Sequence, residues 1–162
     1  MKLHPDRPPE GTVRDWVDAR AETGGVAMTF PETGAVLTWV ELRDHAAQVA
    51  ADLTAQGIAK GESIAVVHPN GRDGVKALYA ALYGGFRVTM INLAAGPDAI
   101  AYALDHSEAR VAFVHDDQVE MFNAAKPERL SLYAPGASRA PLHDVDAQDD
   151  ALLMYTSGTT GR

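Results

Sequence analysis

Three short runs of apolar and β-branched residues begin at residues 63, 87 and 110, and this even spacing constrains the fold more than any other feature. Helical patterns follow the first two runs, over Gly71–Tyr83 and from Pro97 to His106. A strand–helix unit that repeats at this interval is typical of a parallel sheet joined by helices. The sequence therefore predicts an α/β fold: a doubly wound, largely parallel sheet with flanking helices.

The predicted sheet has three principal strands, Ser63–His68, Arg87–Ile91 and Arg110–Val114. A helix near Gln118–Ala125 and a strand near Arg129–Tyr133 extend the same alternation. The polar stretch 135–150 interrupts it, and we interpret this stretch as a surface connection.

The N-terminal part carries clear signals for the ends of helices. Thr12 can cap a first helix that Gly24 and Gly25 end. The turn residues 31–34 separate two β-like runs, Val26–Phe30 and Ala35–Thr38, which predicts a hairpin. Thr38 and Glu41 then form the pattern of a capping box at the start of a second helix.

Apolar spacing predicts which face of each helix is buried. In the second helix the predicted stripe consists of Leu42, Ala46, Val49 and Leu53, with Gly57 as the stop. In the alanine-rich third helix, Gly71–Tyr83, the predicted apolar face consists of Val75, Leu78, Tyr79 and Leu82.

Composition narrows the class of protein. The 162 residues are 46% hydrophobic and 22% charged, as in an ordinary globular domain. No apolar run approaches the roughly 20 residues that span a bilayer, so no membrane span is expected. A formal net charge of −8 argues against nucleic acid as a partner. The absence of cysteine excludes disulfides and cysteine nucleophiles, and we expect a cytoplasmic protein.

One motif, at the end of the sequence, indicates a binding function. The apolar run Ala151–Tyr155 predicts a strand, and it leads directly into the sequence TSGTTGR at residues 156–162. Glycines that tolerate positive φ can turn several backbone N–H groups toward one anion, and hydroxyl groups add further donors. The sequence lacks the Gly-Lys pair of a Walker A loop and the G-x-G-x-x-G of a dinucleotide fold. We interpret the motif as a phosphate-binding loop of another kind.

The run Met154–Arg162 closely resembles the phosphate-binding motif of the AMP-forming, or adenylate-forming, synthetase superfamily, which includes acyl-CoA synthetases. Upstream segments resemble the same family, and together the similarity spans most of residues 12–162. The segments are TWVEL at Thr38–Leu42, GIAKGESIAVV at Gly57–Val67, AALYGGFRVTMIN at Ala80–Asn92, and SEARVAFV at Ser107–Val114. Met90 and Ile91 stand where the family commonly has proline.

The resemblance implies a parent enzyme that activates a carboxylic acid with ATP and Mg²⁺, and then transfers the acyl group from the adenylate to the thiol of CoA. It assigns the nucleotide-binding loop to Thr156, Ser157, Gly158, Thr159, Thr160 and Gly161. It allows no catalytic residue and no metal ligand to be assigned in this chain, because the family's other motifs come later. Tyr155 is expected to close the strand.

The resemblance further implies that residues 1–162 form the N-terminal part of the large domain, without the rest of that domain or the C-terminal domain. We therefore expect the chain alone to be inactive. Two alternatives stay open. The parent can be an adenylation domain that acylates a carrier protein, or the chain can be a non-catalytic interaction module that forms a homodimer through an exposed sheet edge.

Other polar and aromatic residues carry weaker signals. His68 lies at a strand end, where ligands approach, but a structural histidine with a backbone partner is the favoured interpretation. His106 fits as a charge partner of a helix C-terminus. The acidic stretch 143–150 lacks the pattern of a calcium loop and is interpreted as solvated. Trp16 and Trp39 are expected to be packing residues.

Overall fold

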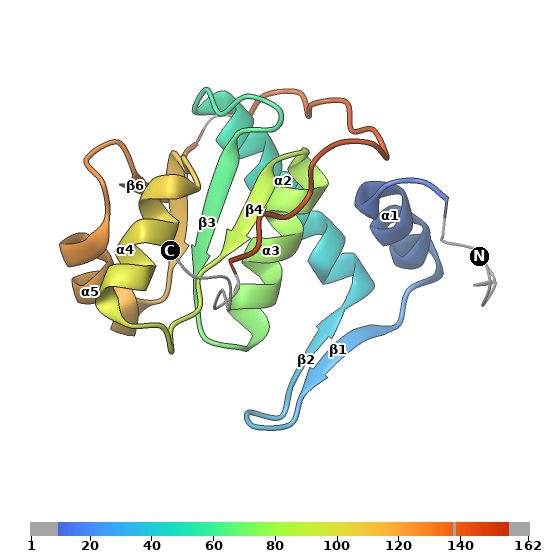
Figure 1. Cartoon of the computed structure of the whole chain (residues 1–162). Coiled ribbons are helices and arrows are strands. Elements are labelled where there is room, and N and C mark those ends of the chain that lie inside the picture. The colour runs from blue at the N-terminus through green and yellow to red at the C-terminus, as the bar shows by residue number, and fades with distance from the viewer. Residues whose placement is uncertain (1–9, 138, 156–162) are drawn as a thin grey trace.

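Four parallel strands form the centre of the computed structural model, which describes residues 10–137 and 139–155 (Figure 1). Their order across the sheet is β4-β3-β5-β6. The strands are β3 (Ser63–Val67), β4 (Arg87–Met90), β5 (Val111–Val114) and β6 (Ser131–Leu132). The predicted α/β fold with a parallel sheet and flanking helices is confirmed, and β6 is shorter than the sequence indicated.

The central strand β3 is buried along its whole length, because helices cover both faces of the sheet. Its register pairs Ile64 with Val88 of β4 and with Val111 of β5. Ile64 and Val66 point into one hydrophobic core, whereas Ala65 and Val67 point into a second core on the opposite face. The continuous apolar character of the strand follows from this double burial.

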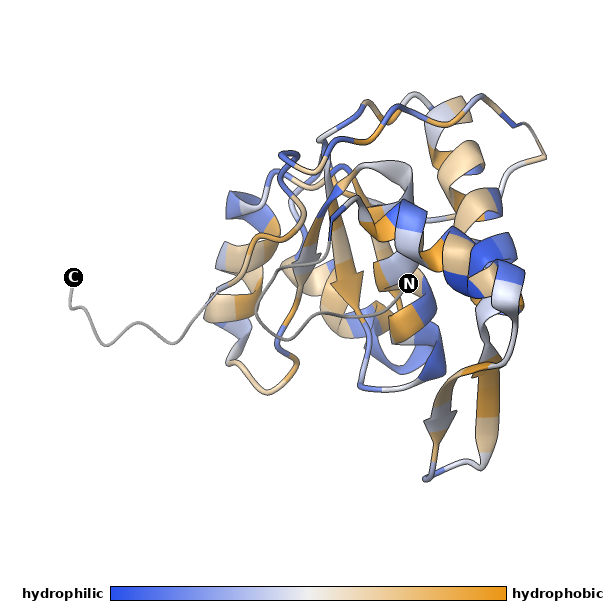
Figure 2. Ribbon diagram, turned by 90° about the vertical axis from the view of Figure 1, so that its right-hand side faces the viewer, coloured by the Kyte–Doolittle hydropathy of each residue, from blue (hydrophilic) through white to orange (hydrophobic). Residues whose placement is uncertain are grey.

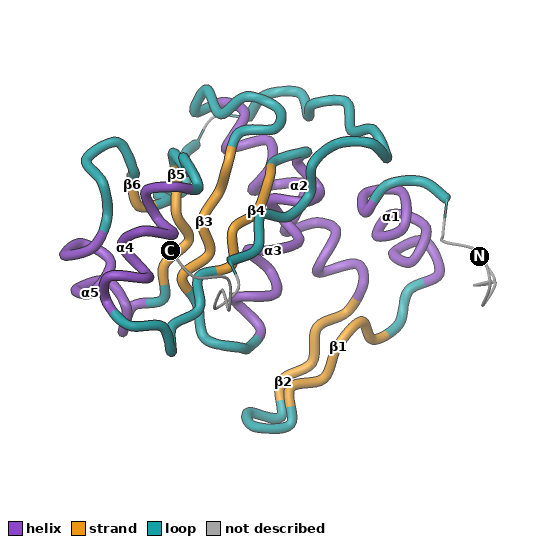
Figure 3. Tube along the Cα trace, in the orientation of Figure 1, coloured by secondary structure: helices purple, strands orange, loops and turns teal. Residues whose placement is uncertain are grey.

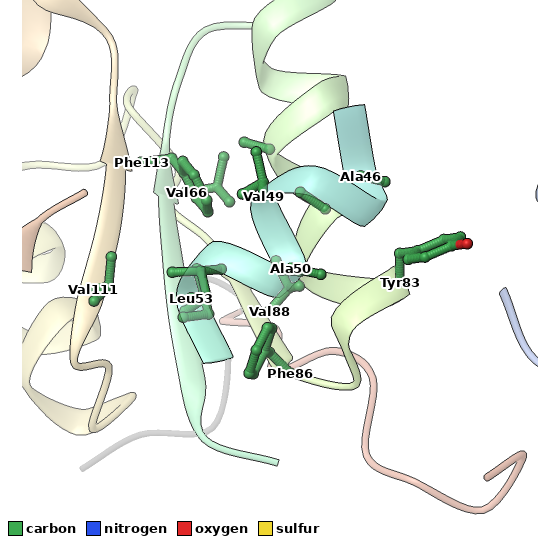
Figure 4. Close-up of a cluster of buried hydrophobic side chains, with 14 of the residues drawn as sticks. Ala46, Val49, Ala50, Leu53, Val66, Tyr83, Phe86, Val88, Val111 and Phe113 are labelled. Atoms are coloured by element: carbon green, nitrogen blue, oxygen red, sulfur yellow. The ribbon is translucent and has the colours of Figure 1, made fainter. Parts of the chain in front are cut away.

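The first face carries three helices: α1 (Val13–Thr23), α2 (Trp39–Ala55) and α3 (Arg72–Gly84). The predicted stripe of α2 is confirmed, since Leu42, Ala46 and Leu53 are completely buried. Figure 4 shows α2 side chains meeting those of β3 and β5 in this core, with Phe86 below them.

The buried face of α3 differs from the predicted one. Most of its buried positions are small residues, among them Ala77, Ala80, Ala81 and Gly84, and Tyr83 is the one large side chain buried with them. The larger residues expected in the core, Val75, Leu78, Tyr79 and Leu82, are only half-buried. Small side chains let the α3 backbone approach α2 and the sheet closely, so residue size decides the packing face here.

The second face carries α4 (Pro97–His106) and α5 (Val119–Ala125), with the short 3₁₀ helix η1 (Asp116–Gln118) before α5. Ile100, Leu104 and Phe122 of these helices pack against the sheet. Among the described residues, no helix combines the length and apolar character that a bilayer span requires.

The predicted hairpin is formed by β1 (Val26–Phe30) and β2 (Ala35–Thr38), which pair antiparallel. It extends away from the central sheet (Figure 2). Capping boxes begin the helices on either side of it. Thr12 and Asp15 cap α1, and Thr38 and Glu41 cap α2, so the predicted cap of α2 is confirmed.

The connection over residues 135–150 crosses one end of the sheet as a long loop (Figure 3). A buried carboxylate anchors its start: Asp52 of α2, only 2% exposed, accepts hydrogen bonds from the Tyr133 hydroxyl at 2.7 Å and the Gly136 N–H at 2.9 Å. Burial alone would raise the pKa of Asp52, but the hydrogen bonds from Gly136 and Tyr133 outweigh it and lower the pKa.

Candidate functional site

The carboxyl ends of β3 and β5 mark the place where this sheet favours ligand binding. The chain leaves β3 for α3 on the first face, and leaves β5 for α5 on the second face. Adjacent strands whose connections diverge in this way leave a crevice beyond their carboxyl ends. The strand order β4-β3-β5-β6 puts this switch point between β3 and β5.

Two histidines occupy the switch point. His68 directly follows β3 and His115 directly follows β5, and their ring centres lie 5.6 Å apart in an edge-to-face arrangement. The Asp117 N–H donates to Nδ1 of His115 at 3.3 Å, which leaves Nε2 as the protonated nitrogen of the neutral ring. Burial lowers the pKa of His68, and the neighbouring His115 lowers it further. The pair brings two imidazole rings to this edge of the sheet, where their nitrogens can hydrogen-bond a ligand.

His68 was predicted as a candidate from its place at a strand end, whereas His115 was not predicted. Each histidine is the first residue after a strand of the repeating unit, so comparison of the strand ends would have found the pair. The backbone partner expected for His68 does not occur among residues 10–137 and 139–155, where the His68 ring instead packs edge-on against the His115 ring. The β3–α3 loop beside them borders a hollow of about 390 Å³ lined by Asn70, Gly71 and Met90, among others.

The strand predicted over Ala151–Tyr155 is wrong. The segment makes one isolated parallel bridge, Leu152 with Val88, beside the edge strand β4. Its hydrogen bonds run from the Val88 N–H to the Ala151 carbonyl and from the Leu153 N–H to the Val88 carbonyl. Leu152 is 49% exposed and Met154 is 75% exposed. The apolar pattern therefore gains little burial at this outer edge, and no ladder continues.

Tyr155 also differs from its expected role of closing a strand. Its hydroxyl hydrogen-bonds Nδ1 of His106, in the last turn of α4, at 2.8 Å. The His106 ring stacks on Tyr102 with ring centres 5.2 Å apart, and Tyr155 meets the Tyr102 ring edge-on at 6.1 Å. The residue just before the predicted phosphate loop is thus held by the C-terminal turn of α4, and His106 acts as a hydrogen-bond partner of a side chain.

The predicted loop residues Thr156, Ser157, Gly158, Thr159, Thr160 and Gly161 lie outside the described residues. The acidic stretch before them makes a salt bridge between Asp149 and Lys60 at 2.8 Å. In the part of the chain that the structure describes, no three His, Asp or Glu side chains are arranged to hold a metal ion.

The sequence matches the family model described as AMP-binding enzyme over residues 15–162. This match covers most of the chain and includes the strands, the helices and the terminal motif. The chain belongs to the AMP-binding enzyme family. The predicted resemblance to adenylate-forming enzymes is confirmed.

Curated relatives in this family include CoA ligases. The chain is 28% identical over 153 residues to 2-succinylbenzoate–CoA ligase of Bacillus licheniformis, covering 91% of this chain and 32% of the relative. It is 33% identical over 147 residues to sulfoacetate–CoA ligase of Cupriavidus necator, covering 81% of this chain and 29% of the relative. The chain therefore spans about a third of the length of these relatives.

Solved structures share the fold. The N-terminal domain of FACL13 from Mycobacterium tuberculosis superposes with a TM-score of 0.78 at 22% identity, covering 91% of this chain and 42% of that chain. At this identity the similarity concerns the fold, and it matches the parallel sheet with flanking helices of an adenylate-forming N-terminal domain.

Proposed function

We propose that residues 1–162 form the N-terminal part of the large domain of an ATP-dependent acid–CoA ligase. The proposed enzyme joins a carboxylic acid to the α-phosphate of ATP, releases pyrophosphate, and passes the acyl group to the thiol of CoA. The family match over residues 15–162 carries this proposal, and the CoA-ligase relatives support it. CoA is proposed as the acceptor in preference to a carrier protein on the strength of those relatives.

The motif at residues 156–161 is the proposed nucleotide-binding element. Its hydroxyl groups and the backbone N–H groups next to Gly158 and Gly161 are donors suited to the β- and γ-phosphates of ATP. Donors held in place stabilise the negative charge that develops on the leaving pyrophosphate. The Mg²⁺ that accompanies ATP would neutralise part of the same charge.

The decisive experiment is carboxylate-dependent exchange of pyrophosphate into ATP by the full-length gene product, measured across a panel of carboxylic acids. We expect exchange with at least one acid, followed by thioester formation when CoA is added. The 162-residue chain alone is expected to give none, because it spans only about a third of its relatives. Exchange by the isolated chain would contradict the proposed domain assignment, and its absence from the full-length product would contradict the proposed activity.

Single substitutions test the loop in the full-length product. Replacing a hydroxyl donor, as in Thr160→Val or Ser157→Ala, should slow adenylate formation by roughly 10²-fold, the effect of losing one preorganised donor. Ser131→Ala, at an exposed position in β6, is the matched control and should leave the rate unchanged. Equal rates for all three variants would show that the loop does not hold the phosphates.

One observation favours the alternative of self-association. Met90, Leu152 and Met154 are 40%, 49% and 75% exposed, and they lie on β4 or on the segment beside it. Exposed apolar residues at a sheet edge promote pairing between copies. We propose concentration-dependent dimerisation of the isolated chain at this edge. Size-exclusion chromatography with light scattering tests it, and a monomer at every concentration would contradict it.

A further inference from the structure

An apolar groove of about 400 Å³ lies between α1, the first residue of α2, and half-buried apolar side chains of α3 at the margin of the core. Its volume falls in the range of small-molecule sites. Valines and leucines line it together with three aromatic residues and one cation. The lining residues are Val13, Trp16, Val17, Arg20, Trp39, Leu78, Tyr79 and Leu82.

The walls of the groove are suited to an apolar ligand. Trp16 and Trp39 are the only two tryptophans in the sequence, and both line the groove. The Trp16 Nε1–H donates to the Glu10 carbonyl at 2.8 Å, so the polar atom of this indole is already satisfied. Leu78 and Leu82 pack against the core but are only half-buried, so part of their apolar surface is open to a ligand.

Arg20 supplies the single charge among the lining residues. Its guanidinium carbon lies 5.9 Å from the centre of the Trp39 ring, so the charge is held at the rim of the groove. Among the described residues, no carboxylate forms an ion pair with Arg20. Arg14 of the same helix is different, because its Nε–H donates to the Tyr83 carbonyl at 2.9 Å. Arg20 is therefore the arginine of α1 that can pair with a ligand.

We propose that this groove binds an amphiphilic monocarboxylate, with the hydrocarbon part against Trp16, Trp39 and Leu82 and the carboxylate paired with Arg20. Charge complementarity selects the anion, and the aromatic walls select its apolar body. The site is built from α1, α2 and α3; it shares only Leu78 with the hollow beside the β3–α3 loop and includes none of residues 156–161. It therefore does not depend on the proposed activity.

Tryptophan fluorescence of the 162-residue chain tests the proposal directly, since both indoles line the groove. Decanoate, added below the concentration at which it forms micelles, should change the emission saturably. Decanol should bind more weakly, and decyltrimethylammonium should cause no saturable change. Arg20→Gln should weaken decanoate binding about three- to fivefold, the effect of one exposed ion pair, without changing decanol binding. Arg20→Lys should retain most of the decanoate affinity.

Arg43→Gln is the matched control, because Arg43 lies on α2, pairs with Asp44 and does not line the groove. It should bind decanoate like the unaltered chain. The proposal fails if decanoate gives no saturable change, or if Arg20→Gln and Arg43→Gln bind it equally. It also fails if the emission depends on protein concentration alone, since a second copy would then fill the groove. Decanoate binding that appears only after deletion of residues 1–9 would likewise overturn it, because the chain's own N-terminus would be the occupant.

Discussion

Helices α2 and α3 pack against the same face of the sheet, but different properties of their sequences determine the face that each buries. In α2 the buried positions are the apolar stripe, and Leu42 and Leu53 are completely buried. In α3 all the buried positions except Tyr83 are alanine or glycine, whereas Leu78 and Leu82 line an outer groove. Hydrophobic periodicity identifies the core face when a helix packs through large side chains, and misidentifies it when close approach requires small ones.

The end of α3 shows how tight this approach is. A Cβ atom on Gly84 would lie 2.3 Å from a ring carbon of Phe86 and 3.1 Å from the Cβ of Ala50 in α2. Phe86 itself is 1% exposed and fills the space beneath the two helices. The α2–α3 contact therefore depends on the absence of a side chain as much as on the apolar character of its neighbours.

The largest expected effect comes from the core of α2. Leu53→Ala should lower the free energy of unfolding by about 3 kcal/mol, because it removes a fully buried side chain and leaves a cavity. Leu78→Ala in α3 should lower it by only about 1 kcal/mol, because that side chain is already partly exposed. Denaturant unfolding of the chain measures both. An equal or larger loss for Leu78→Ala would reverse the comparison of the two helices.

The second effect tests the close approach. Gly84→Ala should destabilise the chain by about 2 kcal/mol, since the added methyl group overlaps the Phe86 ring. Gly96→Ala is the control, because a Cβ at Gly96 meets no atom within 4 Å and its φ of −65° suits any residue. Thermal unfolding should show a lower midpoint for the first variant and little change for the second. Similar midpoints would mean that the helices have room to separate.

A pH-dependent effect arises at the same interface, where His45 of α2 is half-buried near charged residues of α3. Burial lowers the pKa of His45 from 6.5 to about 4, with contributions from Lys76 and Arg72 that lower it and from Asp73 that raises it. As pH falls from 6.5 toward 4, the unfolded chain binds a proton that the folded chain does not, so stability decreases over that window.

With allowance for partial exposure, the loss due to His45 should be about 1–2 kcal/mol. His45→Gln should remove that part of the pH dependence while the acidic groups keep theirs. Urea unfolding at a series of pH values from 7 to 4 compares the two proteins. Parallel stability profiles would show that His45 is as easily protonated in the folded chain as in the unfolded one.

The smallest effect concerns the helix starts. The Thr38 hydroxyl caps α2, and the Glu41 carboxylate accepts from the Thr38 N–H at 2.8 Å, whereas Gly71 begins α3 without a side-chain cap. Thr38→Ala should therefore cost about 1 kcal/mol. Thr38→Ser keeps the hydroxyl and should cost clearly less. If both variants lose the same amount, the hydroxyl contributes nothing, and the two helices do not differ in this respect.

The candidate site also contains one part that the sequence predicts and other parts that only the structure reveals. The motif at 156–161 was found from the sequence because its composition and order are distinctive. The His68–His115 pair was only half found, since residues far apart in the chain become neighbours only when parallel strands align their ends. The Tyr155–His106 contact was not predicted, because the apolar run before the loop motif predicts a strand. In the structure this segment lies at the exposed edge beside β4, and its pairing stops after one bridge.

The sequence by itself determined the order of helices and strands as far as β6, the cap of α2, the hairpin and the family, because each depends on neighbouring residues or on a regular spacing. Tertiary structure decided which face of α3 is buried, which strand ends meet, and where Tyr155 binds. These outcomes depend on how closely whole elements approach one another, and that distance is set by the volumes of side chains from several elements at once. The requirement for glycine at position 84, for example, arises only because Phe86 and Ala50 leave no room for a side chain there.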